Sequence, residues 1–283
     1  MSDRLQPGEP VELAPGIRRL VAPNPGLMTG PGTNTYLLGE REVAVLDPGP
    51  YMPEHVERIL EVAGAPVRWI LVTHTHPDHS PAAGPLRAKT GATAIGIAAP
   101  AGPHQDMTFA PDHVPENGEV LNTDDFELTM LHTPGHASNH VCFLHGATRL
   151  LFTGDHIING STAVIDPPDG NMNDYLDSLR RLREFSIEAI AGGHGELIQT
   201  PYEAIDWLVE HRLRREAKVV DKLSHRPNAQ VSELVADVYD DVDPAVHPVA
   251  TRSLLAHLLK LEEDGAAVVD DERWRLTGAS PAG

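Results

Sequence analysis

A dense group of metal-binding side chains follows an apolar run in the first third of the chain. The segment 74–79 reads HTHPDH and directly follows residues 67–72, which we expect to form a buried strand. Side chains two apart on an extended chain point the same way, so His74 and His76 can share one ion. Pro77 then turns the last two residues of the segment toward a second position. The cluster predicts two metal ions and a hydrolase that depends on them.

Three later segments share one pattern, in which a short apolar strand precedes a turn with one metal-binding side chain. The segments are 131–136 (LHTPGH), 151–155 (LFTGD) and 190–195 (IAGGHG), with His136, Asp155 and His194 as candidate ligands. Glycines at these turns allow the backbone to approach an ion closely. A histidine beside a glycine is usually an ordinary turn residue. Because these motifs follow the 74–79 segment in order, we interpret them as one site.

The candidate ligands divide into two groups and a bridge: His74, His76 and His136 for one ion; Asp78, His79 and His194 for the other; and Asp155 between them. Two cations about 3.5–4 Å apart lower the pKa of a bridging water toward about 7 and polarise a substrate oxygen. We expect Asp78 and Asp155 to orient the resulting hydroxide. A single cysteine excludes a thiolate-rich site, so any metal must be held by histidine and aspartate. We expect zinc as the common ion, and sites of this kind also accept manganese or iron. His140 and His156 lie near the ligands in sequence and are candidates for supporting contacts, with ordinary packing as the alternative.

The alternation of strands and helices predicts an α/β (α+β) fold. Strands are expected at 17–22, 36–46, 67–72, 93–98, 119–122, 126–131, 140–145, 149–153 and 187–191, and helices at 56–63, 81–90 and 175–185. Many strands follow one another as in hairpins, which favours a mixed-sheet sandwich with outer helices over a doubly wound sheet. Helices at 202–223, 231–239 and 251–263 and a hairpin at 267–276, turning at 270–271, follow the order of a winged helix. We expect two domains, 1–203 and 204–283.

Composition narrows the class of protein. The formal charge is −19, which opposes the binding of nucleic acid. An acidic surface is typical of simple solubility or of a saline or high-G+C source, and a cationic partner is the alternative. No apolar run is long enough to span a membrane, and the first fifteen residues lack the pattern of a signal peptide. With one cysteine and no disulfide, we expect a cytoplasmic protein.

Residues 17 to about 200 resemble the metallo-β-lactamase superfamily. The resemblance rests on Asp47 in the segment VLDPG, on the 74–79 segment, and on His136, Asp155 and His194. It implies a four-layer αβ/βα sandwich with two metals at the sheet edges, and Asp47 as a support for one ligand; a plain turn former is the alternative. Zinc β-lactamases of the commonest subclass have a cysteine where this chain has Asp155. The aspartate resembles the glyoxalase II, RNase Z and general hydrolase branches, so antibiotic hydrolysis is not the expected role.

The segments 32–37, 172–179 and 254–262 are similar to the β-lactamase-like protein 2 group, which adds a C-terminal winged-helix-like domain. This resemblance implies either of two activities: its animal members are mitochondrial endoribonucleases on single-stranded RNA, and similar fungal proteins are thioesterases. It also places five residues on loops that face the cleft, as substrate contacts: Asn34, Ser161, Thr162, Asn173 and Tyr175. Each could instead form a turn or a cap, notably Asn173 before a helix at Tyr175.

Three functions therefore compete. The first is hydrolysis of an ester, thioester or lactone, with a small-molecule or acyl substrate. The second is an endoribonuclease, which the 16 acidic and 10 basic side chains of residues 201–283 oppose. A basic strip could still bind phosphates, although a solvated helix face is the alternative: Arg212, Arg214, Arg215 and Lys218. The third is a non-enzymatic protein whose winged helix binds DNA or a protein partner. The negative charge of residues 201–283 opposes DNA binding, and the family resemblance implies instead that this part packs on the catalytic domain, lines the cleft or builds a homodimer. The complete ligand set argues against a purely binding protein, and the acidic surface favours the first function over the second.

Overall fold

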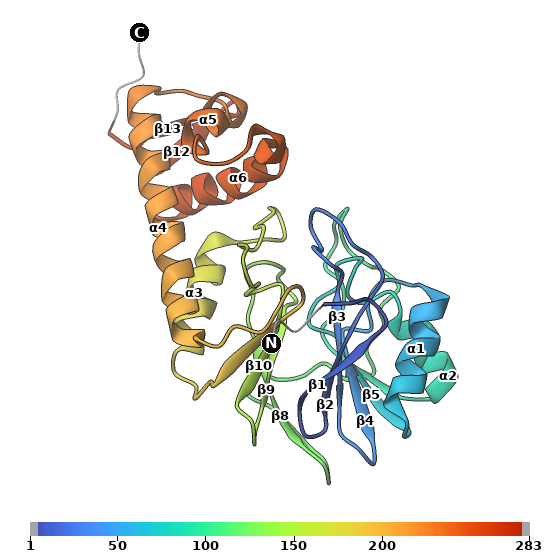
Figure 1. The fold of residues 1–283 in the computed structure, drawn as a ribbon. Coiled ribbons are helices and arrows are strands. Elements are labelled where there is room, and N and C mark those ends of the chain that lie inside the picture. The colour runs from blue at the N-terminus through green and yellow to red at the C-terminus, as the bar shows by residue number, and fades with distance from the viewer. Residues whose placement is uncertain (1–4, 279–283) are drawn as a thin grey trace.

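Two mixed β-sheets form the centre of the N-terminal unit in the computed structural model, which describes residues 5–278 (Figure 1). The first sheet has six strands in chain order: β1 (Pro10–Ala14), β2 (Ile17–Val21), β3 (Asn34–Leu38), β4 (Val43–Leu46), β5 (Val67–Leu71) and β6 (Thr93–Ile95). Neighbours are antiparallel from β1 to β4, and β4, β5 and β6 run parallel. Hairpins and parallel crossovers are thus combined in one sheet.

The second sheet has five strands in the order β11-β10-β9-β8-β7. Its strands are β7 (Val120–Asn122), β8 (Glu127–His132), β9 (Val141–His145), β10 (Leu150–Gly154) and β11 (Ala189–Gly192). Successive strands are antiparallel from β7 to β10, and β11 is parallel to β10. Strands β8, β10 and β11 therefore run in one direction and end at the same edge of the sheet.

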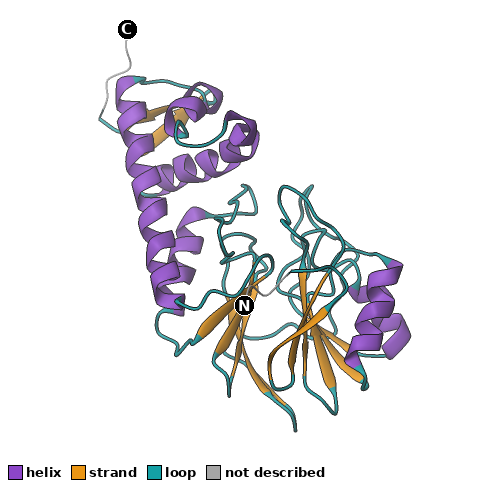
Figure 2. Cartoon of the chain, in the orientation of Figure 1, coloured by secondary structure: helices purple, strands orange, loops and turns teal. Residues whose placement is uncertain are grey.

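Apolar side chains from both sheets fill the space between them, including Tyr36 and Phe152, whose ring centroids lie 4.9 Å apart. Helices α1 (Pro53–Ala63) and α2 (Ala83–Thr90) cover the outer face of the first sheet, and α3 (Met172–Leu182) covers that of the second (Figure 2). The apolar face of α3 follows the helical period, with buried residues at 172, 175, 176, 179 and 182. This arrangement confirms the predicted four-layer sandwich.

The C-terminal elements pack on one long helix, α4 (Pro201–His225) (Figure 1). They are α5 (Val231–Val238), the 3₁₀ helix η1 (Pro244–Val246), α6 (His247–Glu263), β12 (Ala267–Asp270) and β13 (Arg273–Leu276). The first half of α4 places Ile205 and Leu208 in the core beneath α3, and its second half places Val219 and Leu223 in the C-terminal core. The predicted boundary between residues 203 and 204 therefore lies inside a continuous helix.

Several predicted boundaries need correction. The segment 36–46 contains two strands, β3 and β4, with a turn at 39–42, and the structure adds β1, which sequence reasoning missed. Helix α3 begins at Met172, because the side chain of Asn171 accepts a hydrogen bond from the backbone N–H of Asp174. Asn173 therefore lies within the helix and not before it. Helix α6 begins at His247, four residues earlier than predicted.

No helix among residues 5–278 is both long enough and apolar enough to cross a membrane.

Candidate metal centre

The candidate ligands come together where strands of both sheets end. They follow separate strands: His74 after β5, His136 after β8, Asp155 after β10 and His194 after β11. Glycine is required beside His194, because a Cβ atom at Gly193 would lie 2.6 Å from Cε1 of His79 and 2.7 Å from Oδ1 of Asp155. The close approach predicted for these glycine turns is present in the structure.

Three histidines form the first group, with one ring nitrogen from each within 4.8 Å of the others. Nδ1 of His76 lies 2.9 Å from Nε2 of His74 and 2.9 Å from Nε2 of His136. Nδ1 of His136 lies 2.6 Å from the carbonyl oxygen of Val164, which can only accept, so the proton of this ring is on Nδ1. Burial, together with the nearby His136, lowers the pKa of His76 to about 3. Burial also holds the pKa of His74 well below its usual value, so His74 and His76 are neutral. One nitrogen from each of the three rings faces the centre of the group.

Two histidines and two carboxylates form the second group: Asp78, His79, Asp155 and His194. Nε2 of His194 lies 3.2 Å from Oδ2 of Asp78 and 3.3 Å from Oδ1 of Asp155. Nε2 of His79 is also 3.3 Å from this Oδ1, whereas Oδ2 of Asp155 lies 3.9 Å from Nε2 of His136 in the first group. The two oxygens of Asp155 therefore face different groups.

A buried carboxylate beneath the site sets the protonation of two candidate ligands. Oδ1 of Asp47 accepts the backbone N–H of Thr73 at 2.8 Å, and its Oδ2 accepts the Thr73 hydroxyl at 2.7 Å. Oδ2 also lies 2.9 Å from Nδ1 of His79. Because the Thr73 hydroxyl donates to Asp47, its oxygen accepts from Nδ1 of His74, 3.0 Å away. Both histidines therefore carry a proton on Nδ1, which leaves Nε2 as the atom that can bind an ion. Burial alone would lower the pKa of His79, but Asp78, Asp155 and Asp47 raise it well above its usual value, so an ion would displace a second proton from this ring.

The second group carries a charge arrangement that suits a cation. Burial alone would lower the pKa of His194, but Asp155 and Asp78 raise it to about 10. Nε2 of His194, Nε2 of His79 and Oδ1 of Asp155 are buried and make no hydrogen bond. A divalent cation would displace the proton of His194 and give each of these atoms a partner. The residues present thus fit a metal in this group as well as in the first.

His140 and His156, the predicted supporting histidines, lie behind the first group. The ring of His140 stacks on that of His74 with a centroid distance of 5.1 Å, and its Nδ1 lies 3.0 Å from the Thr133 hydroxyl. His156 is fully buried, 5.6 Å from His140 and 4.8 Å from the ring of Tyr175. Of the two, only His140 contacts a candidate ligand directly.

Three predicted substrate contacts lie within regular secondary structure rather than on loops. Asn34 is buried on β3, and its amide donates to the backbone oxygens of Gly192 and Gly195 at 3.0 and 2.9 Å. Tyr175 is buried on α3, and its hydroxyl donates to the backbone oxygen of His156. These contacts satisfy buried backbone acceptors, so Asn34 holds the His194 turn against the first sheet.

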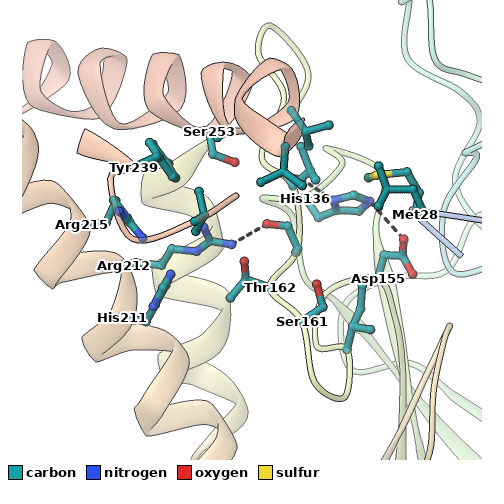
Figure 3. A pocket seen from close by; sticks show the side chains of 18 residues that line it. Met28, His136, Asp155, Ser161, Thr162, His211, Arg212, Arg215, Tyr239 and Ser253 are labelled. Atoms are coloured by element: carbon teal, nitrogen blue, oxygen red, sulfur yellow. Dashed lines mark hydrogen bonds and ion pairs between the residues drawn. The ribbon is translucent and has the colours of Figure 1, made fainter. Parts of the chain in front are cut away.

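The other predicted contacts divide between a helix and a cavity. Asn173, on α3, donates to a carboxylate oxygen of Glu263 at 2.8 Å, which ties α3 to α6. Ser161 and Thr162 lie on the loop after β10 and line a cavity that also contains His136 (Figure 3). Only these two of the five side chains face space that a substrate could occupy.

Sequence reasoning missed the role of Thr73 and counted Arg212 only as part of a basic strip. Arg212 and Arg215 are buried, so a solvated helix face is the wrong description of these two. A signal was available, because Leu208, Arg212, Arg215 and Val219 follow the spacing of a single helix face.

Comparison with known proteins decides the family. Residues 28–194 match the model of the metallo-beta-lactamase superfamily, and residues 231–274 match that of the beta-lactamase associated winged helix domain. The chain belongs to the metallo-beta-lactamase superfamily. The predicted resemblance and the predicted winged-helix unit are thereby confirmed, and the chain is a metal-dependent hydrolase of this superfamily.

Relatives of this superfamily match most of the chain. A "Beta-lactamase-like protein 2 homolog" of Drosophila melanogaster is 30% identical over 89% of this chain and 90% of its own length. An "Atrochrysone carboxyl ACP thioesterase" of Passalora fulva is 32% identical over 81% of this chain and 69% of its own. A metallo-beta-lactamase family protein of Thermus thermophilus, 23% identical, shares the fold with a TM-score of 0.78 over 94% of this chain and 100% of its own.

Proposed function

We propose that this hydrolase holds two divalent cations and acts on an ester, a thioester or a lactone. The observation that carries the proposal is the orientation of three histidine rings. His74, His79 and His136 each form a hydrogen bond through Nδ1, which leaves Nε2 directed toward the other candidate ligands. Imidazoles and carboxylates without a thiolate suit zinc, with manganese and iron as alternatives. We assign Asp155 as the bridge, because its two oxygens face different groups.

When bound, two cations would lower the pKa of a water molecule and polarise the acyl oxygen of the substrate. We assign Asp78 and Asp155 to orient the attacking water, since their side chains are 25% and 13% exposed at the edge of the group. In thioester hydrolysis the water oxygen bonds to the acyl carbon and the carbon–sulfur bond breaks. The products are a carboxylate, a thiol and one proton.

Ion pairs in the basic strip favour an acyl substrate over RNA. Three of its four residues have a carboxylate partner: Arg214 with Glu210 at 3.7 Å, Arg215 with Asp241 at 2.7 Å, and Lys218 with Asp240. These pairs leave little free positive charge for a phosphate backbone. The fungal relative named as a thioesterase also supports an acyl substrate.

We also propose that residues 1–203 supply the metal ligands and that residues 204–283 supply one wall of the substrate cavity. Residues of both parts line the same space, including Asp155 and Ser161 from the first and Arg212 and Tyr239 from the second. A cytoplasmic location and a homodimer stay predictions.

A panel of substrates tests the proposed activity. Purified protein is assayed on a p-nitrophenyl ester, an acyl thioester, a lactone and labelled single-stranded RNA, with metal content measured on the same preparation. We expect hydrolysis of an acyl substrate and about two ions per chain. Asp155→Ala is the blank and loses both activity and metal, whereas Asp177→Asn, an exposed change on α3, keeps both. Full turnover by the Asp155→Ala protein, or cleavage of RNA alone, refutes the proposal.

A further inference from the structure

A cavity of about 370 Å³ connects the metal groups with the C-terminal unit (Figure 3). One end is formed by His136 and Asp155, and the other lies against α4 and the segment after α5. Apolar side chains line much of the space between, among them Ile158, Val246 and Val249. A short acyl chain fits such walls, because its methylene groups leave water without losing hydrogen bonds.

Arg212 brings an unneutralised charge to this cavity. Its side chain is 3% exposed, and one guanidinium nitrogen donates to the backbone oxygen of Ala163. The guanidinium also lies over the ring of Tyr175, 5.3 Å from the centroid, and its Nε is buried without a hydrogen bond. Among residues 5–278, no carboxylate forms an ion pair with it. A buried charge without a partner is costly, so the site is incomplete without an anion.

A second residue of the cavity wall, Tyr239, also carries an unpartnered polar group. The hydroxyl of Tyr239 is buried and makes no hydrogen bond, although its ring is held by Arg215, 4.2 Å from the centroid. Burial raises the pKa of Tyr239, so the group remains a neutral hydroxyl that can donate a proton in a hydrogen bond. Arg212 and Tyr239 thus line one cavity from different segments of the C-terminal unit, and each carries a donor without a partner.

The neighbouring arginine shows the contrast. Arg215 is also buried, but both of its terminal nitrogens bind the carboxylate of Asp241, at 2.7 and 3.0 Å. Its charge is therefore compensated within the protein. His211, which lines the cavity as well, has its pKa lowered to about 4 by burial and then by the charges of Arg212 and Arg215. At the end of the cavity away from the candidate ligands, Arg212 is therefore the arginine whose charge no carboxylate of the described residues compensates.

We propose that the acyl group of the substrate carries a second, ionised carboxylate, which Arg212 and Tyr239 bind while the scissile carbonyl lies beside His136 and Asp155. The inference rests on the proposed function and names its substrate class: the thioester or ester of a short dicarboxylic acid. A carboxylate accepts from a guanidinium and a hydroxyl at the same time, and the apolar walls contact the chain between its two ends.

Matched thioesters test this inference. Succinyl, glutaryl and adipyl thioesters of N-acetylcysteamine are compared with the butyryl, pentanoyl and hexanoyl thioesters, which have equal chain lengths and no second carboxylate. We expect kcat/KM to be at least about 10-fold higher for one dicarboxylic member than for its neutral partner. Equal rates on each pair overturn the inference and leave the proposed function intact. No hydrolysis of any thioester or ester contradicts the proposed function instead.

Variants locate the anion site. Arg212→Gln should lower kcat/KM for the preferred dicarboxylic thioester about 10- to 150-fold, mainly through KM, the range expected for one hydrogen bond to a charged group. The same variant should change the neutral partner less than about threefold. Tyr239→Phe should give a loss near the lower end of the same range, about 10-fold, because it removes one hydrogen bond to the carboxylate but no full charge. Arg214→Gln removes an exposed charge from the same helix and should leave the preference unchanged. An Arg212→Gln protein with unaltered preference overturns the inference.

A binding measurement remains informative if the arginine variant does not fold. Thermal unfolding of the metal-loaded wild-type protein is followed with glutarate, pentanoate or inorganic phosphate. We expect glutarate to raise the midpoint and pentanoate not to, and Tyr239→Phe to reduce the glutarate shift. Stabilisation by phosphate and not by glutarate would assign the pair to a phosphate ligand and overturn the proposal. This measurement does not depend on hydrolysis, so it separates failure of the anion site from failure of the enzyme activity.

Discussion

Replacing Asp47 by asparagine should weaken the metal centre although Asp47 belongs to neither group of candidate ligands. Asp47 has a φ of 48°, a left-handed conformation that asparagine tolerates well, so the backbone should be retained. The new amide nitrogen would face two donors at the position of Oδ2, the Thr73 hydroxyl and Nδ1 of His79. Both bonds would be lost, whereas the bond from the Thr73 backbone N–H to Oδ1 can remain.

The expected magnitude follows from those bonds. A hydrogen bond to a charged group contributes about 1.5–3 kcal/mol, equivalent to about 10- to 150-fold in an equilibrium constant. Loss of a supporting contact of this kind typically weakens metal affinity about 10- to 100-fold. Because His79 belongs to the second group, we expect this loss at the second ion and a parallel fall in activity. Thr73→Val, which keeps the His79–Asp47 contact, should weaken mainly the first ion, through His74.

Competition with a chromogenic chelator measures both affinities. Asp177→Asn serves as the matched control, because that side chain is 71% exposed on α3 and lies outside both ligand groups. If Asp47→Asn binds both ions within twofold of the wild-type affinity, the assignment of protons through Asp47 is wrong. The comparison requires that the Asp47→Asn variant is folded. Urea unfolding of the metal-free variant shows whether it is.

Two further predictions concern stability. Gly135→Ala would place a Cβ 2.3 Å from Cα of Tyr175 at a φ of 140°, and should lower the free energy of unfolding by about 1–3 kcal/mol or more. Gly118→Ala, which also has a positive φ but meets no atom within 4 Å, should lose only about 1–2 kcal/mol, and equal losses in urea titrations would argue against the overlap. Arg215 lowers the pKa of Asp241 to about 2 from 3.8, so this pair stabilises the fold above pH 3.8 and ceases to do so as the pH falls toward 2. Asp241→Asn should flatten that part of the pH profile of the urea midpoint, and an unchanged profile would show that the pair contributes nothing.

Local pattern was sufficient for much of the fold and for the groups of ligands. Some features can be recognised from residues that are close together in the sequence. They are the 74–79 segment, the strand-turn motifs and the apolar face of α3. The end of α2 at Thr90 agrees with the predicted helix 81–90, because a glycine follows it and Gly91 adopts a left-handed φ of 69°. The groups that the structure places together, around His76 and around Asp155, are the groups that motif order suggested.

Long-range contacts limited the remaining predictions. Asn34 is a polar residue near a glycine, and only the packing of one sheet on the other shows that its amide holds the turn at Gly192. Strand β1 is short and half exposed, so its composition gives little signal. Arg212 and Arg215 look alike in sequence, and only the position of Asp241, 26 residues after Arg215, shows that one charge is compensated and the other is not.

Helix α4 belongs to two hydrophobic cores at once, with Ile205 in one and Leu223 in the other. Dividing the chain within α4 would expose apolar side chains of at least one of the two cores to water. We therefore expect the two units to unfold together in one cooperative transition, rather than as independent domains joined by a flexible linker. Exchange of the C-terminal module between family members would, for the same reason, require grafting at a matched helical turn.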